Sequence, residues 1–253
     1  SIVLVILGLL TGGILTGQNL IRAAELRSVT TEFRNYQTAV MTFRDKYFAL
    51  PGDMRNATDF WGSSASCPGT AGTGEQTCNG DGDGQIENPA AASQYGESLM
   101  FWQHLSNAGM IEGSYPGMAG GTASNHHIAG ENAPAGKIGN SVWGSYYFGN
   151  RQDHVELFNG SYGNTIWLGN VSGAAPGGNL LHPEEAWNID TKIDDGLPAR
   201  GRVVTLERRG NCTIGSDGTA PLTTSAAHAA DLDAKYHLQH AAPSCSLMMR
   251  NLH

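Results

Sequence analysis

The chain begins with an apolar segment that passes without a break into a one-sided helix. Residues 1–20 contain no charged side chain and are rich in isoleucine, valine and leucine, so lipid or other apolar helices could surround the segment on every face. Further along, apolar side chains recur at alternating steps of three and four residues, which places them on one helical face. These positions are Leu26, Val29, Phe33, Tyr36, Val40, Phe43, Tyr47 and Leu50. The pattern predicts one continuous helix whose second half packs against a globular body.

Proline and glycine end this helix and separate it from the rest of the chain. Pro51 disfavours helical geometry at the preceding residue, and the glycine after it suits a turn. At about 1.5 Å of rise per residue, residues 1–50 would extend for roughly 75 Å, which exceeds the diameter of a small domain. We therefore expect the helix to protrude, with residues 1–25 as its apolar half, residues 26–50 as its amphipathic half and residues 51–253 as a globular head.

The head is predicted to combine short helices with an antiparallel sheet. One helix has Ser93 as its cap and Gly109 at its end, and a second begins near Pro183 and ends in the turn at residues 194–196. The apolar face of the first helix consists of Leu99, Trp102 and Leu105. Strand-like runs bounded by turn residues occupy residues 142–148, 155–158, 165–168 and 203–206. The predicted fold class is α+β, with a long protruding N-terminal helix packed on a glycine-rich head that contains an antiparallel β-sheet.

The composition of the chain favours one type of head and argues against one class of partner. The 253 residues include 34 glycines and only 15% charged residues, a mixture that favours a turn-rich domain over a helical bundle. The formal net charge is −8, and lysine and arginine form no cluster. Because affinity for phosphate backbones comes mainly from such clusters, the sequence argues against a nucleic-acid partner.

The cysteines indicate an oxidising compartment. Cys67, Cys78, Cys212 and Cys245 form an even set without a CxxC pair, which fits structural disulfides better than a zinc or redox site. Four cysteines allow three pairings. We expect sequential pairing, because the first two would close a short glycine-rich loop and the last two would close the C-terminal segment. The protein is therefore expected outside the cytoplasm.

Three features together resemble the type IV pilin and pseudopilin superfamily: the start SIVLVILGLL, its unbroken passage into an amphipathic helix, and the glycine-rich, disulfide-bearing head. The segments FRDKYFALPGDM, residues 43–54, and NIDTKIDDGLPARGRV, residues 188–203, are also similar to heads of uncharacterised prepilin-type proteins. In that family a prepilin peptidase cuts before a residue that becomes N-methylated, usually phenylalanine, and a glutamate follows shortly after. Both positions would lie upstream of Ser1.

The resemblance implies a structural, non-enzymatic subunit that polymerises with copies of itself into an extracellular type IV pilus-like filament on the cell surface. Before assembly, the N-terminal helix would hold the subunit in the inner membrane, where the prepilin peptidase and the pilus or secretion assembly machinery would be its partners. A type II secretion pseudopilin or a minor pilin is the alternative. A membrane-tethered binding protein or enzyme is a third interpretation. The acidic balance fits either an adhesive surface with bound cations or simply a soluble one.

A loop directly after the second cysteine resembles the first half of a calcium-binding EF-hand loop. Oxygen-bearing side chains recur there at alternate positions, with glycines between them, and Gly84 supplies the sharp turn. The predicted ligands are the side chains of Asn79, Asp81, Asp83 and Glu87 and the backbone carbonyl of Gln85. We expect Ca²⁺ as the ion, because it accepts flexible ligation by oxygen.

The loop departs from the EF-hand pattern at its twelfth position, which is Ala90. A bidentate carboxylate must therefore come from elsewhere, and Glu87 and Glu97 are the candidates. The alternative to a calcium site is a Gly-Asp turn exposed to water, since both residues are common in loops.

The sequence contains only weak indications of catalysis, of a second metal site or of sugar binding. No GxSxG, HExxH or P-loop pattern occurs, so no catalytic site is predicted. His237 and His240 lie three residues apart near Asp231 and Asp233, a spacing that suits either a metal-binding pair or ordinary surface histidines. Four aromatic residues in the strand-like runs suit either a sugar-binding platform or, as their alternation with small residues favours, a core. They are Trp143, Tyr146, Tyr147 and Trp167.

Glycines weaken the apolar half of the N-terminal helix. Gly8, Gly12, Gly13 and Gly17 each lower helix stability by about 1 kcal/mol relative to alanine. We expect local unwinding between the first and last of them once the subunit is assembled, as the resemblance also implies. The alternative is that an apolar environment preserves the helix, because unpaired backbone groups are costly without water.

Overall fold

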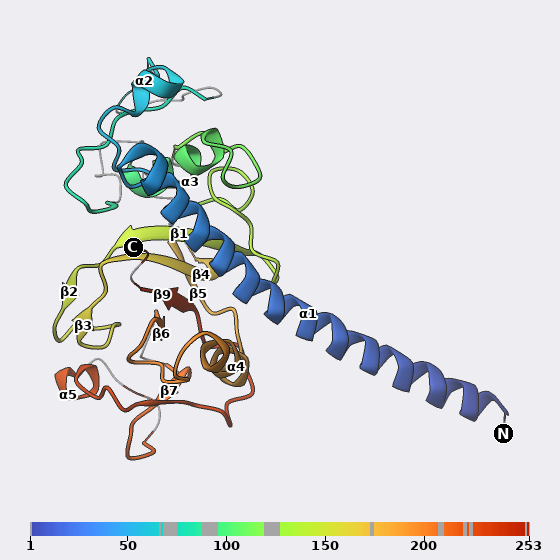
Figure 1. The fold of residues 1–253 in the computed structure, drawn as a ribbon. Helices are drawn as coiled ribbons and strands as arrows, with labels where there is room; N and C mark the ends of the chain where they lie inside the picture. The colour runs from blue at the N-terminus through green and yellow to red at the C-terminus, as the bar shows by residue number, and fades with distance from the viewer. Residues whose placement is uncertain are drawn as a thin grey trace.

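The computed structural model shows a long helix attached to an α+β head (Figure 1). Helix α1 (Ile2–Tyr47) is unbroken over 46 residues, and its N-terminal half projects away from all other elements. The structure describes residues 2–65, 67, 75–87, 96–118, 127–172, 175–206, 210–219, 222, 225–250 and 252. The continuous N-terminal helix predicted from the sequence is confirmed.

The second half of α1 is buried along the predicted stripe. Four stripe positions are fully buried in the main core: Val29, Phe33, Val40 and Phe43. Tyr36 lies edge-on against Trp102 and Trp143, with ring centroids 5.1 and 5.3 Å away. Each such side chain contributes about 1.5–3 kcal/mol through burial. This half of α1 is therefore an integral part of the head's core.

The end of α1 differs slightly from the prediction, because the helix stops at Tyr47, three residues early. Phe48 has a φ of 54°, and its N–H donates to the carbonyl oxygen of Arg44 at 2.8 Å. This left-handed geometry stops the helix. Gly52 follows with a φ of 90°, and its N–H donates to Nδ1 of the buried His104 at 2.9 Å. The turn is therefore set by tertiary contacts as well as by the proline.

The main sheet is antiparallel, with strand order β1-β4-β9-β6 and with β5 paired to β4. The strands are β1 (Ser141–Tyr147), β4 (Asn164–Ser172), β5 (Ala175–Gly178), β6 (Val203–Thr205) and β9 (Leu247–Met249). Two small two-stranded antiparallel sheets pair β2 (Asn150–Arg151) with β3 (Gly160–Ser161), and β7 (Thr213–Ile214) with β8 (Lys235–Tyr236). The α+β class with an antiparallel sheet is confirmed.

One predicted strand is wrong. Residues 155–158 form no strand; instead the Nδ1 atom of His154 accepts hydrogen bonds from the N–H groups of Glu156 and Leu157 at 3.1 and 3.2 Å. Leu157 and Phe158 are buried in two small clusters without pairing to a neighbouring strand. Their apolar character reflects burial in a turn. The other three runs lie on β1, β4 and β6.

The described part of the head contains two helices that the sequence predicts, α3 (Glu97–Asn107) and α4 (Pro183–Ile193), and two short ones that it does not, α2 (Ala57–Trp61) and α5 (Ala226–Ala229). The predicted cap Ser93 lies outside the described residues, and the described helix α3 begins four residues later. Helix α4 begins at Pro183 as predicted. Trp143 and Trp167 are buried, which agrees with their interpretation as core residues, and Tyr146 and Tyr147 are half-buried.

Both disulfides have the predicted sequential pairing. Cys67 is bonded to Cys78, and Cys212 is bonded to Cys245 across 33 positions of sequence. Cys212 and Cys245 are fully buried in the main core. The second bridge therefore ties the C-terminal segment, including β9, to the rest of the head.

Candidate cation loop and assembly helix

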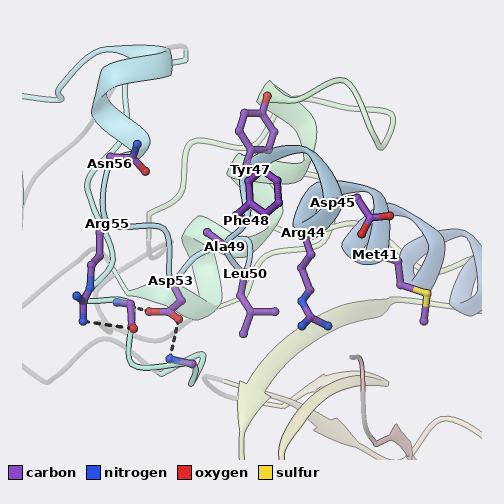
Figure 2. Close-up of a pocket in the computed structure, with 12 residues that line it drawn as sticks. Met41, Arg44, Asp45, Tyr47, Phe48, Ala49, Leu50, Asp53, Arg55 and Asn56 are labelled. Carbon is purple, nitrogen blue, oxygen red and sulfur yellow. Dashed lines mark hydrogen bonds between the residues drawn. The ribbon is translucent and has the colours of Figure 1, made fainter.

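One side of the loop after Cys78 is tied to Asp53, which follows the turn at the end of α1 and is only 4% exposed. Its carboxylate accepts hydrogen bonds from the N–H groups of Gly82 and of Gly84, the latter at 2.8 Å (Figure 2). Burial raises the pKa of Asp53; these hydrogen bonds oppose the rise, and the charges of Asp83 and Asp81 add to it. Asp53 therefore both shapes the loop and places a buried carboxylate against it.

The other side of the loop is tied to Glu97, the first residue of α3, which is 7% exposed. Its carboxylate accepts hydrogen bonds from the N–H groups of Asp81 at 3.0 Å and of Glu87 at 3.3 Å. Burial raises the pKa of Glu97 to about 8. A carboxyl group with this pKa is mostly protonated at neutral pH unless a cation beside it favours the ionised form.

These anchors bring five carboxylates together. Oxygens of Asp53, Asp81 and Asp83 lie within 4.8 Å of one another, and so do oxygens of Asp81, Glu87 and Glu97. Asp81 belongs to both groups, so the five side chains form one continuous cluster. Glu97 supplies a carboxylate from outside the loop, which the departure from the EF-hand pattern required.

Two predicted ligands make other contacts. The side-chain oxygen of Asn79 accepts a hydrogen bond from the N–H group of Thr58 at 2.9 Å, in the first turn of α2. The N–H group and the side-chain amide of Gln85 both donate to the carboxylate of Asp83 at 2.8 Å. Asn79 therefore caps a backbone N–H group in the first turn of α2, and Gln85 holds Asp83 in position. Ala90, the position that departs from the EF-hand pattern, lies outside the described residues.

The first residue of β4 also holds the loop through side-chain hydrogen bonds to its backbone. Asn164 is buried, and its side chain donates to the carbonyl oxygen of Gly84 at 2.8 Å and accepts from the N–H group of Ile86 at 2.9 Å. The N–H group of Tyr147 in β1 donates to the carbonyl oxygen of Ile86 at 2.8 Å. The loop is thus bonded to the turn after α1, to α3 and to the sheet.

The donor set suits a hard cation. It consists entirely of oxygens, mainly carboxylates, whereas zinc sites in proteins are dominated by cysteine and histidine. Arg55 donates to the carbonyl oxygens of Asp81 and Gly82, so its positive charge is bonded to the backbone of the loop and not to the carboxylates. The residues present therefore fit Ca²⁺ better than a transition metal.

Sequence reasoning missed Asp53, Arg55 and Asn164. In the sequence, Asp53 belongs to the turn that ends the N-terminal helix and to the segment similar to prepilin-type heads, and Asn164 directly precedes a strand-like run. Both act on the loop through contacts across 29 or more positions of sequence. Local spacing carries no signal for such contacts.

The histidine pair does not complete a metal site within the described residues. The rings of His237 and His240 are stacked with centroids 5.6 Å apart, but neither joins a cluster of three metal-binding groups in the part of the chain that the structure describes. Asp233 is paired with Arg200 at 2.9 Å. The remaining neighbour, Asp231, accepts a hydrogen bond from a backbone N–H group.

The projecting half of α1 forms the second candidate site. Nine of its large apolar side chains are 52–76% exposed: Ile2, Val3, Ile6, Leu7, Leu9, Leu10, Ile14, Leu20 and Ile21. The first charged residue of the chain is Arg22, which follows them. In the described part of the chain, no helix has an apolar stretch long enough to cross a membrane.

The base of the projecting half is tied to α4 by a two-pronged ion pair. The Nε and Nη2 atoms of Arg22 donate to the two carboxylate oxygens of Glu185 at 2.6 and 2.7 Å. Glu185 also accepts a hydrogen bond from the N–H group of His182 at the start of α4. A charge-assisted pair with this geometry fixes direction as well as distance. The projecting helix therefore leaves the head at a defined angle.

Comparisons with known proteins identify no relative: no protein-family model, no curated protein and no solved structure matches the chain. What the structure itself establishes is an α+β fold in which a long N-terminal helix packs on an antiparallel sheet. This architecture is compatible with a pilin-like fold.

Proposed function

We propose that this protein is a structural subunit that polymerises through α1 into a type IV pilus-like filament outside the cell. The observation that carries the proposal is the projecting half of α1, where nine large apolar side chains lie in solvent on a helix that extends clear of the head (Figure 1). Burial of apolar surface is favourable by about 25 cal/mol per Å². An uncharged helix that its own head does not cover gains most by packing against apolar partners.

Further copies of the chain are the partner that this proposal assigns. The buried half of α1 and the Arg22–Glu185 pair hold the projecting half in a fixed direction relative to the head. Each helix that packs into a shared core would therefore position its head on the outside. Before assembly, the inner membrane would cover the same apolar surface, with the prepilin peptidase and the assembly machinery as partners implied by the family resemblance.

The assembly proposal is tested with the full chain, purified in detergent and then freed of detergent. Leu10→Glu and Ile14→Glu each place a charge on the projecting half, and Leu232→Glu does so at an exposed leucine of the head. We expect filaments from the parent and from the Leu232 variant, and at least tenfold less assembly from the two helix variants. Undiminished assembly of both helix variants would contradict the proposal. Short assemblies confined to the periplasm of cells would instead indicate a pseudopilin.

We also propose that the loop binds Ca²⁺ through Asp81, Asp83 and Glu87 together with Asp53 and Glu97. The support is the convergence of five carboxylates, two of them buried, without an arginine or lysine bonded to their oxygens in the described structure. A divalent cation would neutralise their mutual repulsion and order the segment. Its role would be to stabilise the head beside the end of α1.

The calcium proposal is tested by thermal unfolding of the protein in calcium and in chelator. Calcium at 100 times its dissociation constant would add about 2.7 kcal/mol to the free energy of unfolding. We expect a higher Tm in calcium for the parent, and no such increase for the double variant Asp81→Ala, Asp83→Ala. An unshifted Tm in the parent would rule out the site.

A further inference from the structure

Phe48 combines two unfavourable features. Its φ of 54° lies in the left-handed region, where a bulky side chain is strained and where glycine or asparagine usually ends a helix. Its side chain is also 92% exposed, so the phenyl ring gains nothing from burial in its own head. Strained backbone of this kind is found most often at functional sites.

The surface around Phe48 is concave and combines apolar with charged side chains. A groove of about 890 Å³ runs from the last turns of α1 to the cation loop. Figure 2 shows Phe48, Leu50 and Arg44 along one wall, and Asp53 and Arg55 on the opposite side. Met41, in the last two turns of α1, also lines the groove and is exposed.

The charges that line the groove balance one another. Arg44 and Arg55 are balanced by Asp45 and Asp53 among its lining residues, so the groove offers no excess charge to an ionic ligand. Residues 2–21 form an uncharged helical segment with large exposed apolar side chains. This segment and the groove lie on the same helix, separated by the half of α1 that packs in the head. The segment therefore reaches such a groove only on another copy.

We propose that Phe48 of one copy packs against the projecting half of α1 of a second copy, an inference that rests on the proposed function. Phe48 lies 27 residues after Ile21 and 46 residues after Ile2, which corresponds to roughly 40–70 Å along the helix axis. Two parallel copies in this contact are offset by that distance. The two contact surfaces differ, and the offset along the helix axis prevents closure into a ring, so the contact continues as an open filament.

Cysteine cross-linking tests both the contact and its direction. Phe48→Cys is combined in one full-length chain with Leu9→Cys, Ile14→Cys or Leu20→Cys, and each protein is assembled by detergent removal and oxidised. We expect at least one of the three pairs to give a ladder of covalent oligomers on a non-reducing gel. Val155→Cys, at another exposed apolar position, replaces Phe48→Cys in the matched control and should give no ladder.

A second variant distinguishes a role of Phe48 in the contact between copies from a role in the stability of its own head. Phe48→Gly removes both the ring and the strain, so we expect the dispersed subunit to keep or raise its Tm while the concentration needed for assembly rises at least tenfold. A purely structural role for Phe48 would instead lower the Tm and leave assembly of the folded protein unchanged, which would overturn the inference.

The outcomes distinguish this inference from the proposed function. Filaments that form without a ladder for any of the three pairs would overturn the Phe48 contact and leave the filament proposal standing. Covalent dimers without longer oligomers would indicate a closed pair and would also overturn it. A parent chain that never assembles would overturn both.

Discussion

At the scale of single residues, burial changes the charge state of two carboxyl groups in this head. Glu97 and Asp190 both have their pKa raised to about 8, in each case chiefly by desolvation. Asp190 accepts hydrogen bonds from the hydroxyl of Tyr236 at 3.0 Å and from the N–H group of Gly196 at 3.2 Å. Both groups also lie beside other carboxylates: Asp190 beside Asp194 and Asp195, and Glu97 beside Asp81 and Glu87. Asp195 is paired with Arg200 at 3.9 Å, whereas no arginine or lysine is paired with the carboxylates around Glu97 in the described residues. The raised pKa therefore reflects a structural role at Asp190, whereas at Glu97 it suits ion binding.

The raised pKa of Glu97 predicts how stability depends on pH. Its folded pKa is above its unfolded value, so in chelator the folded state keeps a proton that the unfolded state has lost between about pH 4.5 and pH 8. The free energy of unfolding should fall across this window, by about 1–2 kcal/mol once solvent screening is allowed for. Tm measured against pH should fall less steeply for Glu97→Gln, and calcium should reduce the fall in the parent.

Asp190→Asn is the matched control, since Asp190 contributes a fall of the same sign from a second carboxylate cluster, in which Asp195 is already paired with Arg200. The slope of Tm against pH should be smaller for this variant than for the parent, by the same amount in calcium and in chelator. A Glu97→Gln protein with the same pH dependence as the parent would show that Glu97 does not titrate as described.

The candidate site was partly predictable from residues close in sequence. The alternation of Asp81 and Asp83 with glycine is a local pattern, and it identified the loop. Asp53 and Asn164 act on this loop only because the chain returns to it from the end of α1 and from β4. The contact of Asn79 with α2 could not be foreseen for the same reason. Spacing predicts candidate ligands, but tertiary contacts decide where their oxygens point.

At the scale of elements, long periodic segments were predictable and short ones were not. The stripe of α1 repeats over many turns, and α4 has a proline at its start, so their positions follow from sequence. Strand β9 has only three residues, Leu247–Met249, yet it lies between β4 and β6 in the sheet. Three apolar residues have no measurable period. Their place in the sheet depends on neighbouring strands and on the buried bridge at Cys245.

The Cys212–Cys245 bridge should contribute most to the stability of the C-terminal segment. It closes a loop of 33 positions, for which chain entropy predicts about 4 kcal/mol, against about 3 kcal/mol for the 11 positions between Cys67 and Cys78. The double variant Cys212→Ser, Cys245→Ser should therefore lose more stability in urea unfolding than Cys67→Ser, Cys78→Ser. Thiol titration of the denatured, unreduced parent should find no free thiol, and four free thiols would contradict the disulfide assignment.

The glycines of α1 yield a prediction about the assembled state. The helix is continuous in the single subunit, so local unwinding between Gly8 and Gly17 concerns the filament alone and stays a prediction. A methyl group added at Gly12 or Gly13 meets no atom within 4 Å, and each alanine should favour helix by about 1 kcal/mol. Amide hydrogen exchange in filaments should be fast between Gly8 and Gly17 in the parent and slower in Gly12→Ala, Gly13→Ala. Slow exchange in the parent, or a filament map with unbroken helical hydrogen bonding from Ile2 to Phe48, would exclude the unwinding.

At the scale of the whole molecule, one half of α1 is packed in the head and the other half projects with its apolar side chains exposed. The head has a core, two disulfides and a loop anchored on three sides, and the second half of α1 belongs to it. The projecting half has apolar side chains in solvent and a fixed exit angle at Arg22. Under the proposed function, a molecule of this shape would bury its remaining apolar surface by associating through the helix.

The most direct test of this account is electron microscopy of material sheared from the surface of cells that produce the protein, with mass spectrometry of the filament band. We predict thin filaments that contain this chain as a repeating subunit and that disappear when Leu10→Glu replaces the parent. Recovery of the chain only as a dispersed monomer, with no filament that contains it under conditions where it is abundant, would contradict the central claim.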